Sequence, residues 1–143
     1  MGIKRSSQAK WTGSVTEGKG DVALGSGAFE GEYSFNSRFG DDIKRTNPEE
    51  LVAAAHSACY SMALTAALGR GGFSPASVDT KATVHLEKIE GGFEIPKIDL
   101  VTVAEVADIS DDEFQTIAKA AKENCPISKV LAGAEITLDA SLK

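Results

Sequence analysis

Apolar residues dominate one stretch of the chain, residues 47–69, which polar residues interrupt at few positions. Asn47 is a favourable N-cap, Pro48 suits the first helical position, and Glu50 three residues after the cap completes a capping box. Alanines and leucines then occupy most sides of the helical wheel, which is typical of a buried helix. We predict one long helix that ends near Gly69, and we interpret it as too short and too interrupted by polar residues to span a membrane.

Alternation of apolar and polar residues predicts β-strands on both sides of this helix. Three short antiparallel strands, separated by glycines, are expected between residues 8 and 36. A charged loop should follow and lead into the helix. Longer strands are expected at residues 78–87, 93–106 and 136–142. Pro96 within the second of these indicates a bulge or an edge.

A second helix is predicted to begin at the capping box Ser110–Glu113 and to end near Asn124, and Pro126 can begin a short third helix. The resulting order is β-β-β-α-β-β-α-β. Grouped strands indicate an α+β fold with an antiparallel sheet, here one domain over residues 1–143. A helix that is apolar nearly all round needs more cover than one sheet face, so we expect a homodimer in which the central helices are sandwiched.

The charge balance excludes some functions. The 143 residues carry a net charge of −6 and no run of basic residues, so we expect no nucleic-acid partner. The first residues contain no apolar segment typical of a signal peptide, which favours the cytoplasm. Thiols are kept reduced in the cytoplasm, so a pair of cysteines there is more often catalytic, redox-sensing or metal-binding than a structural disulfide.

Two cysteines, Cys59 and Cys125, are the candidates for chemistry. A single buried cysteine more often packs in the core as a small apolar residue than acts as a nucleophile. Cys125 precedes Pro126, where the positive end of a helix dipole would favour its thiolate, so the residues alone make it the more acidic thiol. Cys59 lies in the middle of the long helix and would need a cation, for which Arg38 is a candidate.

Glu49 is free of the capping box and lies on the helix face that also carries His56 and Cys59. Ten residues separate Glu49 from Cys59, which is about 15 Å along a helix. The two cannot share one small site within a straight helix. Either an arginine spans the gap, or Glu49 serves the site of a second subunit.

His56 has several possible roles. It could act as a base for Cys59, three residues away, or simply make a hydrogen bond in the core. Together with Cys59, Cys125 and His85 it could also form a Cys2His2 metal site. That spacing matches no zinc pattern, and we expect neither a metal nor another cofactor.

Several segments together resemble the OsmC/Ohr family: Arg38, residues 46–51 leading to Ala58-Cys59, and Cys125-Pro126. The resemblance extends over nearly the whole chain. It implies an intertwined homodimer with sites at the subunit interface. It also implies that Cys59 is the peroxidatic cysteine and Cys125 the resolving one. Arg38 would stabilise the Cys59 thiolate and Glu49 would hold Arg38 by a salt bridge, although Arg45 is close enough in sequence to take that place.

The resemblance implies a thiol peroxidase that reduces organic hydroperoxides in defence against oxidative or osmotic stress. Cys59 would become a sulfenic acid, Cys125 would condense with it to a disulfide, and an external dithiol would reset the pair. Three other interpretations remain open. They are a redox sensor or partner-binding module that uses the same disulfide, a metal-binding storage protein, and a structural dimer whose cysteines only fill space.

Overall fold

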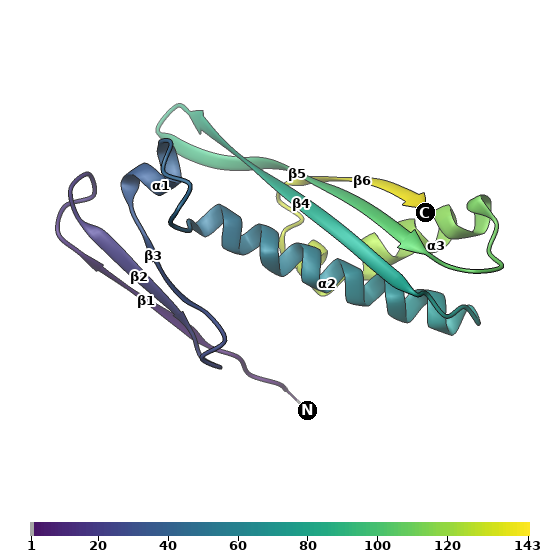
Figure 1. The fold of residues 1–143 in the computed structure, drawn as a ribbon. Coiled ribbons are helices and arrows are strands. Elements are labelled where there is room, and N and C mark those ends of the chain that lie inside the picture. Colours follow the sequence, from purple (N-terminus) through teal and green to yellow (C-terminus); the bar gives the residue numbers. More distant parts are fainter. Residues whose placement is uncertain (1) are drawn as a thin grey trace. The chain divides into compact units, whose positions relative to one another are not determined.

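The structure, a computed structural model, describes residues 2–143 (Figure 1). The chain divides into two compact units, one ending at Leu51 and the other beginning at Val52, and each is described by itself. The elements, in order, are β1 (Ser7–Thr12), β2 (Lys19–Leu24), β3 (Glu30–Tyr33), α1 (Phe35–Phe39), α2 (Pro48–Arg70), β4 (Ser77–Ile89), β5 (Gly92–Glu105), α3 (Asp111–Asn124), α4 (Pro126–Val130) and β6 (Glu135–Leu142). This α+β architecture confirms the predicted fold class.

The first unit contains a small antiparallel sheet in the order β1-β2-β3. The rings of Trp11 and Tyr33 lie on it with their centroids 5.5 Å apart. Gly20 lies beneath both rings, and a Cβ there would collide with Tyr33 and come within 2.9 Å of Trp11. Glycine at this position therefore lets the two aromatic rings pack on the sheet.

A short helix, α1, replaces part of the predicted strand and charged loop. The prediction extended the third strand beyond Phe35, but the strand ends at Tyr33 and α1 begins at Phe35. Ser34 caps the helix by accepting from the Ser37 N–H, and the Ser37 hydroxyl accepts from the Ser34 N–H. This serine capping box favours a helical turn over the strand that the aromatic alternation indicated.

The second unit contains the sheet β4-β5-β6, which is mixed rather than antiparallel. Strands β4 and β5 form the expected antiparallel hairpin, with a register shift between His85 and Glu87 close to Pro96 of β5. Strand β6 pairs in parallel with β5, which corrects the prediction of an antiparallel sheet. The reason is the connection: α3 and α4 carry the chain back across the sheet before β6 begins, and such a crossover makes two strands parallel.

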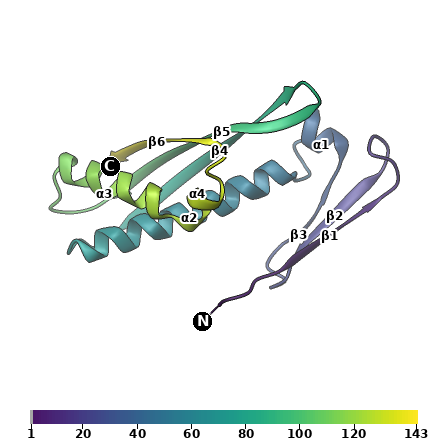
Figure 2. The same ribbon diagram turned by 180° about the vertical axis from the view of Figure 1, so that it is seen from behind.

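The core of the second unit lies between this sheet and the helices α2, α3 and α4, which cover one of its faces (Figures 1 and 2). The other face carries the polar residues of β4, as the alternation predicted. Ser110 caps α3 by accepting from the Glu113 N–H, as expected. The buried core residues are Tyr60, Leu64, Leu68, Leu100, Ala104, Phe114, Ala118, Ala121 and Cys125.

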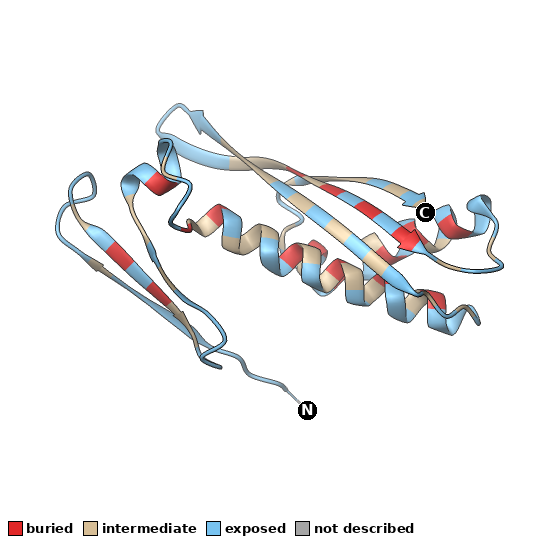
Figure 3. Ribbon diagram, in the orientation of Figure 1, coloured by how far each residue is buried: buried red, intermediate tan, exposed pale blue. Residues whose placement is uncertain are grey.

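Helix α2 spans 23 residues, Pro48–Arg70, and its Asn47 cap accepts from the Glu50 N–H at 2.7 Å. The Glu50 carboxylate accepts from the Thr46 hydroxyl. The helix is long and apolar enough to cross a membrane by length and composition alone, which corrects the argument that it is too short. Buried, partly buried and exposed residues follow one another along the helix (Figure 3). Met62 is 75% exposed, and Ala55, Ala58 and Ala66 are exposed as well.

Candidate active site

The two thiols lie side by side in the second unit. The Sγ atom of Cys125 donates to the Sγ atom of Cys59 across 3.2 Å, and both cysteines are free. Cys125 is fully buried, whereas Cys59 on α2 is partly exposed. A disulfide needs about 2.05 Å between the sulfurs, so an approach of about 1 Å would join them. Packing of α3 and α4 against α2 therefore brings together two cysteines that are far apart in the sequence.

The surroundings of the two thiols shift their pKa values in opposite directions. Burial raises the pKa of Cys59, and the Ile127 N–H offsets this only in part. Burial also raises the pKa of Cys125, but hydrogen bonds outweigh it and lower the pKa of that thiol. In the ionised form of Cys125 the stabilising donors are the Ser128 N–H first, then the Cys59 thiol, the Ser128 hydroxyl and the Ile127 N–H. Cys125 is the N-cap residue of α4, as the sequence predicted, and these amides belong to the first turn of that helix.

His56 contacts the thiol pair indirectly. Its Nε2 atom lies 2.8 Å from the hydroxyl oxygen of Ser128, which is one of the groups that lower the pKa of Cys125. The histidine is completely buried, and burial lowers its pKa below the ordinary value. This is the core hydrogen bond that sequence reasoning considered for His56. The base role toward Cys59 stays a prediction.

Arg38 and Glu49 form an ion pair in the first unit. The Nη2 atom of Arg38 donates to Oε1 of Glu49 at 2.7 Å, and Nε donates to both carboxylate oxygens at 3.1 and 3.2 Å. The Glu49 side chain is only 11% exposed, whereas that of Arg38 is 38% exposed. Such fork-shaped pairing fixes the plane of the guanidinium and leaves its Nη1 side for another anion.

Local sequence holds this pair in place. The Ser37 hydroxyl donates to the Thr46 carbonyl at 2.7 Å, and the Asn47 side-chain amide donates to the Ser37 carbonyl at 3.1 Å. These two bonds fasten α1 to the first residues of α2. Arg38 follows Ser37 directly and Glu49 lies two residues after Asn47, so these two bonds hold the guanidinium and the carboxylate close together.

Arg45, the alternative arginine, has a different partner. Its Nη1 atom lies 2.7 Å from Oδ2 of Asp42, three residues earlier. The pKa of Asp42 is lowered, first by the Lys44 N–H and then by Arg45. Arg45 thus takes part in a local loop contact, whereas Arg38 contacts the carboxylate that the family resemblance implies. The catalytic role of either arginine stays a prediction.

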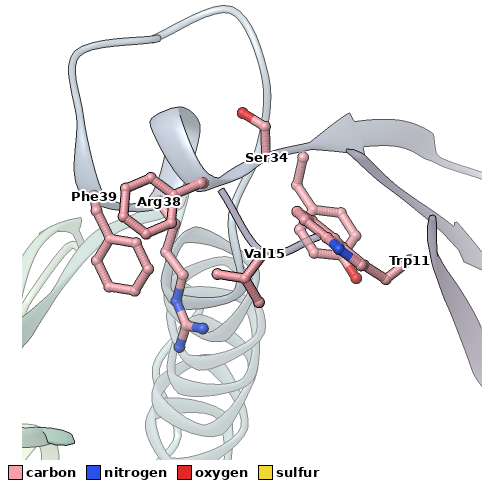
Figure 4. A pocket seen from close by; sticks show the side chains of 7 residues that line it. Trp11, Val15, Ser34, Arg38 and Phe39 are labelled. Atoms are coloured by element: carbon pink, nitrogen blue, oxygen red, sulfur yellow. The ribbon is translucent and has the colours of Figure 1, made fainter. Parts of the chain in front are cut away.

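A cavity of about 150 Å³ lies beside Arg38 in the first unit (Figure 4). Its walls are mostly aromatic or aliphatic, and Arg38 supplies its charge. The Arg38 guanidinium carbon lies 5.2 Å from the centre of the Phe39 ring. The lining residues are Trp11, Val15, Tyr33, Ser34, Phe35, Arg38 and Phe39. An apolar cavity with one cation suits an apolar molecule that carries a partly negative end.

The four residues of the possible Cys2His2 site do not form a cluster among residues 2–143, where no group of three or more His, Cys, Asp or Glu side chains could hold a metal ion. His85 lies on the polar face of β4, and its Nε2 atom pairs with Oδ2 of Asp99 at 2.7 Å. His56 bonds to Ser128 instead. The two histidines therefore have other partners.

Sequence reasoning missed Ser128 and Trp11. Ser128 follows Cys125 by three residues, the spacing at which a helix cap and the first turn interact, so this signal was present. Trp11 lines the cavity only because β1 pairs with β2 and the chain then returns through β3 to α1. No pattern in the sequence connects Trp11 with Arg38.

A neighbouring thiol pair on this α+β topology defines a class of thiol-based redox proteins, and comparison with known proteins identifies the family. The family model "OsmC-like protein" matches residues 40–141. "Peroxiredoxin OsmC" of Escherichia coli (strain K12) is 49% identical over 144 residues, which cover 100% of this chain and 99% of the relative. The chain belongs to the OsmC family.

More distant relatives match this chain in sequence or in structure. "Organic hydroperoxide resistance protein-like 2" of Staphylococcus epidermidis is 32% identical over 90 residues, covering 62% of this chain and 61% of the relative. The crystal structure of OhrB of Bacillus subtilis has a TM-score of 0.69 at 25% identity and covers 96% of this chain and 98% of that one. An OsmC-like protein from Mycoplasma pneumoniae has a TM-score of 0.76 at 15% identity, with 99% of each chain covered.

Proposed function

We propose that this chain reduces organic hydroperoxides to alcohols through a sulfenic acid on Cys59 and a disulfide between Cys59 and Cys125. At the level of the class, the chain is a cysteine-based peroxidase of the OsmC family, in keeping with the relative of 49% identity named a peroxiredoxin. The substrate class follows the relatives named for organic hydroperoxide resistance. The cytoplasm, where a dithiol reductant is available, is the proposed compartment.

The distance of 3.2 Å between the sulfur atoms of Cys59, a partly exposed residue, and Cys125, a fully buried one, carries this proposal. In this proposal the peroxide meets the sulfur of the partly exposed Cys59, and the buried Cys125 reaches that same sulfur afterwards. In the first step the Cys59 thiolate attacks the distal peroxide oxygen, the O–O bond breaks, and the alkoxide takes a proton to leave as an alcohol. In the second step Cys125 attacks the Cys59 sulfur, the S–O bond breaks, and water leaves.

The third step restores the dithiol. One thiolate of an external dithiol attacks the disulfide, and its second thiol completes the exchange, so the reductant leaves as a disulfide. Each turnover thus consumes one hydroperoxide and one dithiol. We propose no metal or cofactor for this cycle.

Arg38 has two proposed tasks, which are to stabilise the Cys59 thiolate and to offset the negative charge that builds on the peroxide oxygens. Its fork-shaped bond to Glu49 supports this role, since it holds the guanidinium in one orientation before substrate arrives. Cys59 needs such a cation, because burial raises the pKa of its thiol. Whether the Arg38–Glu49 pair serves the Cys59 of its own chain or of a second subunit is part of the test below.

We propose that the aromatic cavity beside Arg38 receives the alkyl or aryl group of the substrate. Trp11, Phe35 and Phe39 would remove that group from water while the guanidinium faces the peroxide end. Hydrogen peroxide has no apolar group that these aromatic walls could contact. The cavity therefore favours organic hydroperoxides.

A homodimer completes the proposal. The stripe of α2 that this chain leaves uncovered contains Ala55, Ala58, Met62 and Ala66, all exposed. Small side chains on one helix face allow a second helix to approach closely, so a second copy of α2 would cover this stripe. This agrees with the expectation that the central helices are sandwiched between subunits.

The test is steady-state consumption of cumene hydroperoxide and of hydrogen peroxide with a dithiol reductant, for wild type, Cys59→Ser and Cys125→Ser. We expect a preference for the organic peroxide, no turnover by Cys59→Ser, and impaired turnover with overoxidation by Cys125→Ser. A wild-type rate in Cys59→Ser would overturn the assigned nucleophile. Slow turnover together with a disulfide-dependent binding partner would favour a redox sensor instead.

The place of Arg38 is tested by mixing subunits. A heterodimer of Arg38→Ala and Cys59→Ser subunits has one intact site only if Arg38 and Cys59 of different subunits act together. If both come from the same subunit, the heterodimer has no complete site. Its activity, compared with that of the two parent homodimers, separates the two arrangements.

A further inference from the structure

We propose that the hydrogen bond between His56 and Ser128 is a latch that holds α4 against α2 and thereby keeps the sulfur of Cys125 close to that of Cys59. The latch rests on the proposed function, because it acts on the step in which the disulfide closes. His56 and Ser128 are positioning residues in this proposal, since both act through the placement of Cys125 and neither takes part in the attack on the peroxide.

Two contacts join the same sides of α2 and α4. Nε2 of His56 lies 2.8 Å from the Ser128 hydroxyl oxygen, and the two Sγ atoms lie 3.2 Å apart. His56 and Cys59 are three residues apart on α2. Cys125, the N-cap residue of α4, and Ser128 within that helix are also three residues apart. Residues at this spacing are neighbours on one helix face, so the two contacts lie side by side and together fix the position and the rotation of α4.

Helix α4 has few other attachments. Of its five residues Ser128 is the buried one, and Ile127 is partly buried. Among residues 2–143, the one side-chain hydrogen bond that joins α4 to another element is that between Ser128 and His56. A helix this short is not stable by itself, so its place depends on these attachments. The exposed residues of α4 are Pro126, Lys129 and Val130.

The contacts of His56 suit a latch. The residue is 0% exposed and its Nδ1 atom bonds to no other described residue, so the bond to Ser128 is the single hydrogen bond of the ring within residues 2–143. A buried polar atom without a partner is destabilising, and an apolar side chain at this place on α2 would avoid that penalty. What a histidine provides here, and an apolar residue would not, is the bond to α4.

Disulfide closure depends on how often the two sulfurs meet. Cys125 attacks the Cys59 sulfenic acid, the S–S bond forms, the S–O bond breaks and water leaves, so the rate follows the effective concentration of one sulfur at the other. A second hydroperoxide competes with closure. It transfers one oxygen to the sulfenic acid, which becomes a sulfinic acid, and leaves as an alcohol. By favouring closure, the latch should protect Cys59 from overoxidation.

A first experiment measures the midpoint potential of the Cys59–Cys125 pair in the full chain, without any peroxide. The protein is equilibrated with mixtures of reduced and oxidised dithiothreitol, free thiols are blocked, and the disulfide fraction is counted by mass spectrometry. In Ser128→Ala the disulfide should be about tenfold less favoured, which makes the potential about 30 mV less negative. His56→Leu should give the same shift. A wild-type potential in both variants overturns the latch.

A rescue and a double variant separate the latch from a general loss of stability. His56→Gln places an amide near the position of Nε2, so it can keep the bond to Ser128 and should restore the wild-type potential. Ser128→Ala combined with His56→Leu should shift the potential no further than either change alone, because one bond can be removed only once. Additive shifts, or the absence of rescue by glutamine, overturn the latch.

A second experiment separates the two steps during one turnover of cumene hydroperoxide. Sulfenic acid is trapped with dimedone, and sulfenic acid, sulfinic acid and disulfide are counted by mass spectrometry. In Ser128→Ala closure should slow about tenfold, whereas sulfenic acid formation should change by less than about twofold, because Cys59 belongs to α2. Excess hydroperoxide should then produce more sulfinic acid in the variant than in wild type. Closure at the wild-type rate, or equal slowing of both steps, overturns the latch.

Thr102→Val is the matched control. It also deletes a buried hydroxyl from the second unit, but that hydroxyl bonds to Thr80 and to the Asp79 carbonyl within the sheet. The control should leave the potential and closure unchanged, and a shift as large as that of Ser128→Ala would overturn the latch. If wild type fails to consume the peroxide, the proposed function fails, yet the potentials still decide the latch. If consumption is normal and the potentials of the variants do not move, the latch alone fails.

Discussion

The two compact units assemble their chemistry over very different distances along the chain. In the first unit, Arg38 and Glu49 are 11 residues apart, and two hydrogen bonds from Ser37 and Asn47 bring them together. In the second unit, Cys59 and Cys125 are 66 residues apart and meet only when α3 and α4 pack on α2. The charged pair depends on local capping, whereas the thiol pair depends on a hydrophobic core.

This difference predicts which kind of substitution should impair each of the two units. A change in the core of the second unit should affect stability before chemistry, because the thiols are held by packing. A change near α1 should affect chemistry before stability, because Arg38 is 38% exposed and its pair with Glu49 orients a charge rather than filling the hydrophobic core. The following predictions use this contrast, from the largest expected effect to the smallest.

Phe114→Ala should destabilise the protein by about 3–5 kcal/mol, since it removes a fully buried ring from the core that holds Cys125. Chemical denaturation followed by circular dichroism measures this. Phe29→Ala is the control, because Phe29 in the first unit is 40% exposed and its loss should change stability by about 0.5 kcal/mol or less. Equal losses in the two variants would contradict the contrast.

Arg38→Ala should lower kcat/KM for cumene hydroperoxide about 100-fold, the usual effect of losing a donor that stabilises developing negative charge. Arg38→Lys should recover only part, because lysine cannot form the two-atom fork to Glu49. Arg45→Ala serves as the control and should keep the wild-type rate, since Arg45 pairs with Asp42. The opposite result would transfer the role to Arg45.

Phe39→Ala should lower kcat/KM for cumene hydroperoxide about tenfold and leave that for hydrogen peroxide nearly unchanged. The reason is that one buried aromatic contact contributes about 1.5 kcal/mol toward an apolar group. Steady-state rates with the two peroxides measure the ratio. A parallel loss with both peroxides would show that Phe39 acts on Arg38, over which its ring lies, rather than on the substrate.

Asp99→Asn should change the acid dependence of stability in the second unit. Hydrogen bonds from Thr137 and then His85 lower the pKa of Asp99 to about 2, below the ordinary value of 3.8. A depressed folded-state pKa means that this contribution is present above pH 3.8 and is lost as the pH falls toward 2. Denaturation at pH 5, 3 and 2 (roughly the range set by these values) should therefore show a shallower decline for the variant than for wild type. An identical decline in the two proteins would contradict the prediction.

Much of the fold could be predicted from the pattern of residues because local rules act within a few positions. The Asn47 and Ser110 caps, the long apolar helix and the β4–β5 hairpin all follow from such rules. Helix α1 was not predicted, because its serine capping box competed with an aromatic alternation that favoured a strand. The parallel pairing of β6 was also missed, since strand direction depends on how the intervening helices cross the sheet.

For the site, the sequence by itself determined the reactive groups and one electrostatic preference. Two cysteines, an arginine before the helix and a glutamate in its first turn are visible in the chain, and so is the position of Cys125 at a helix start. Only the tertiary structure decided which groups meet. The 3.2 Å between the two sulfurs and the 2.8 Å between Nε2 of His56 and the Ser128 hydroxyl each join side chains far apart in sequence, and burial of these groups together is what brings them into contact.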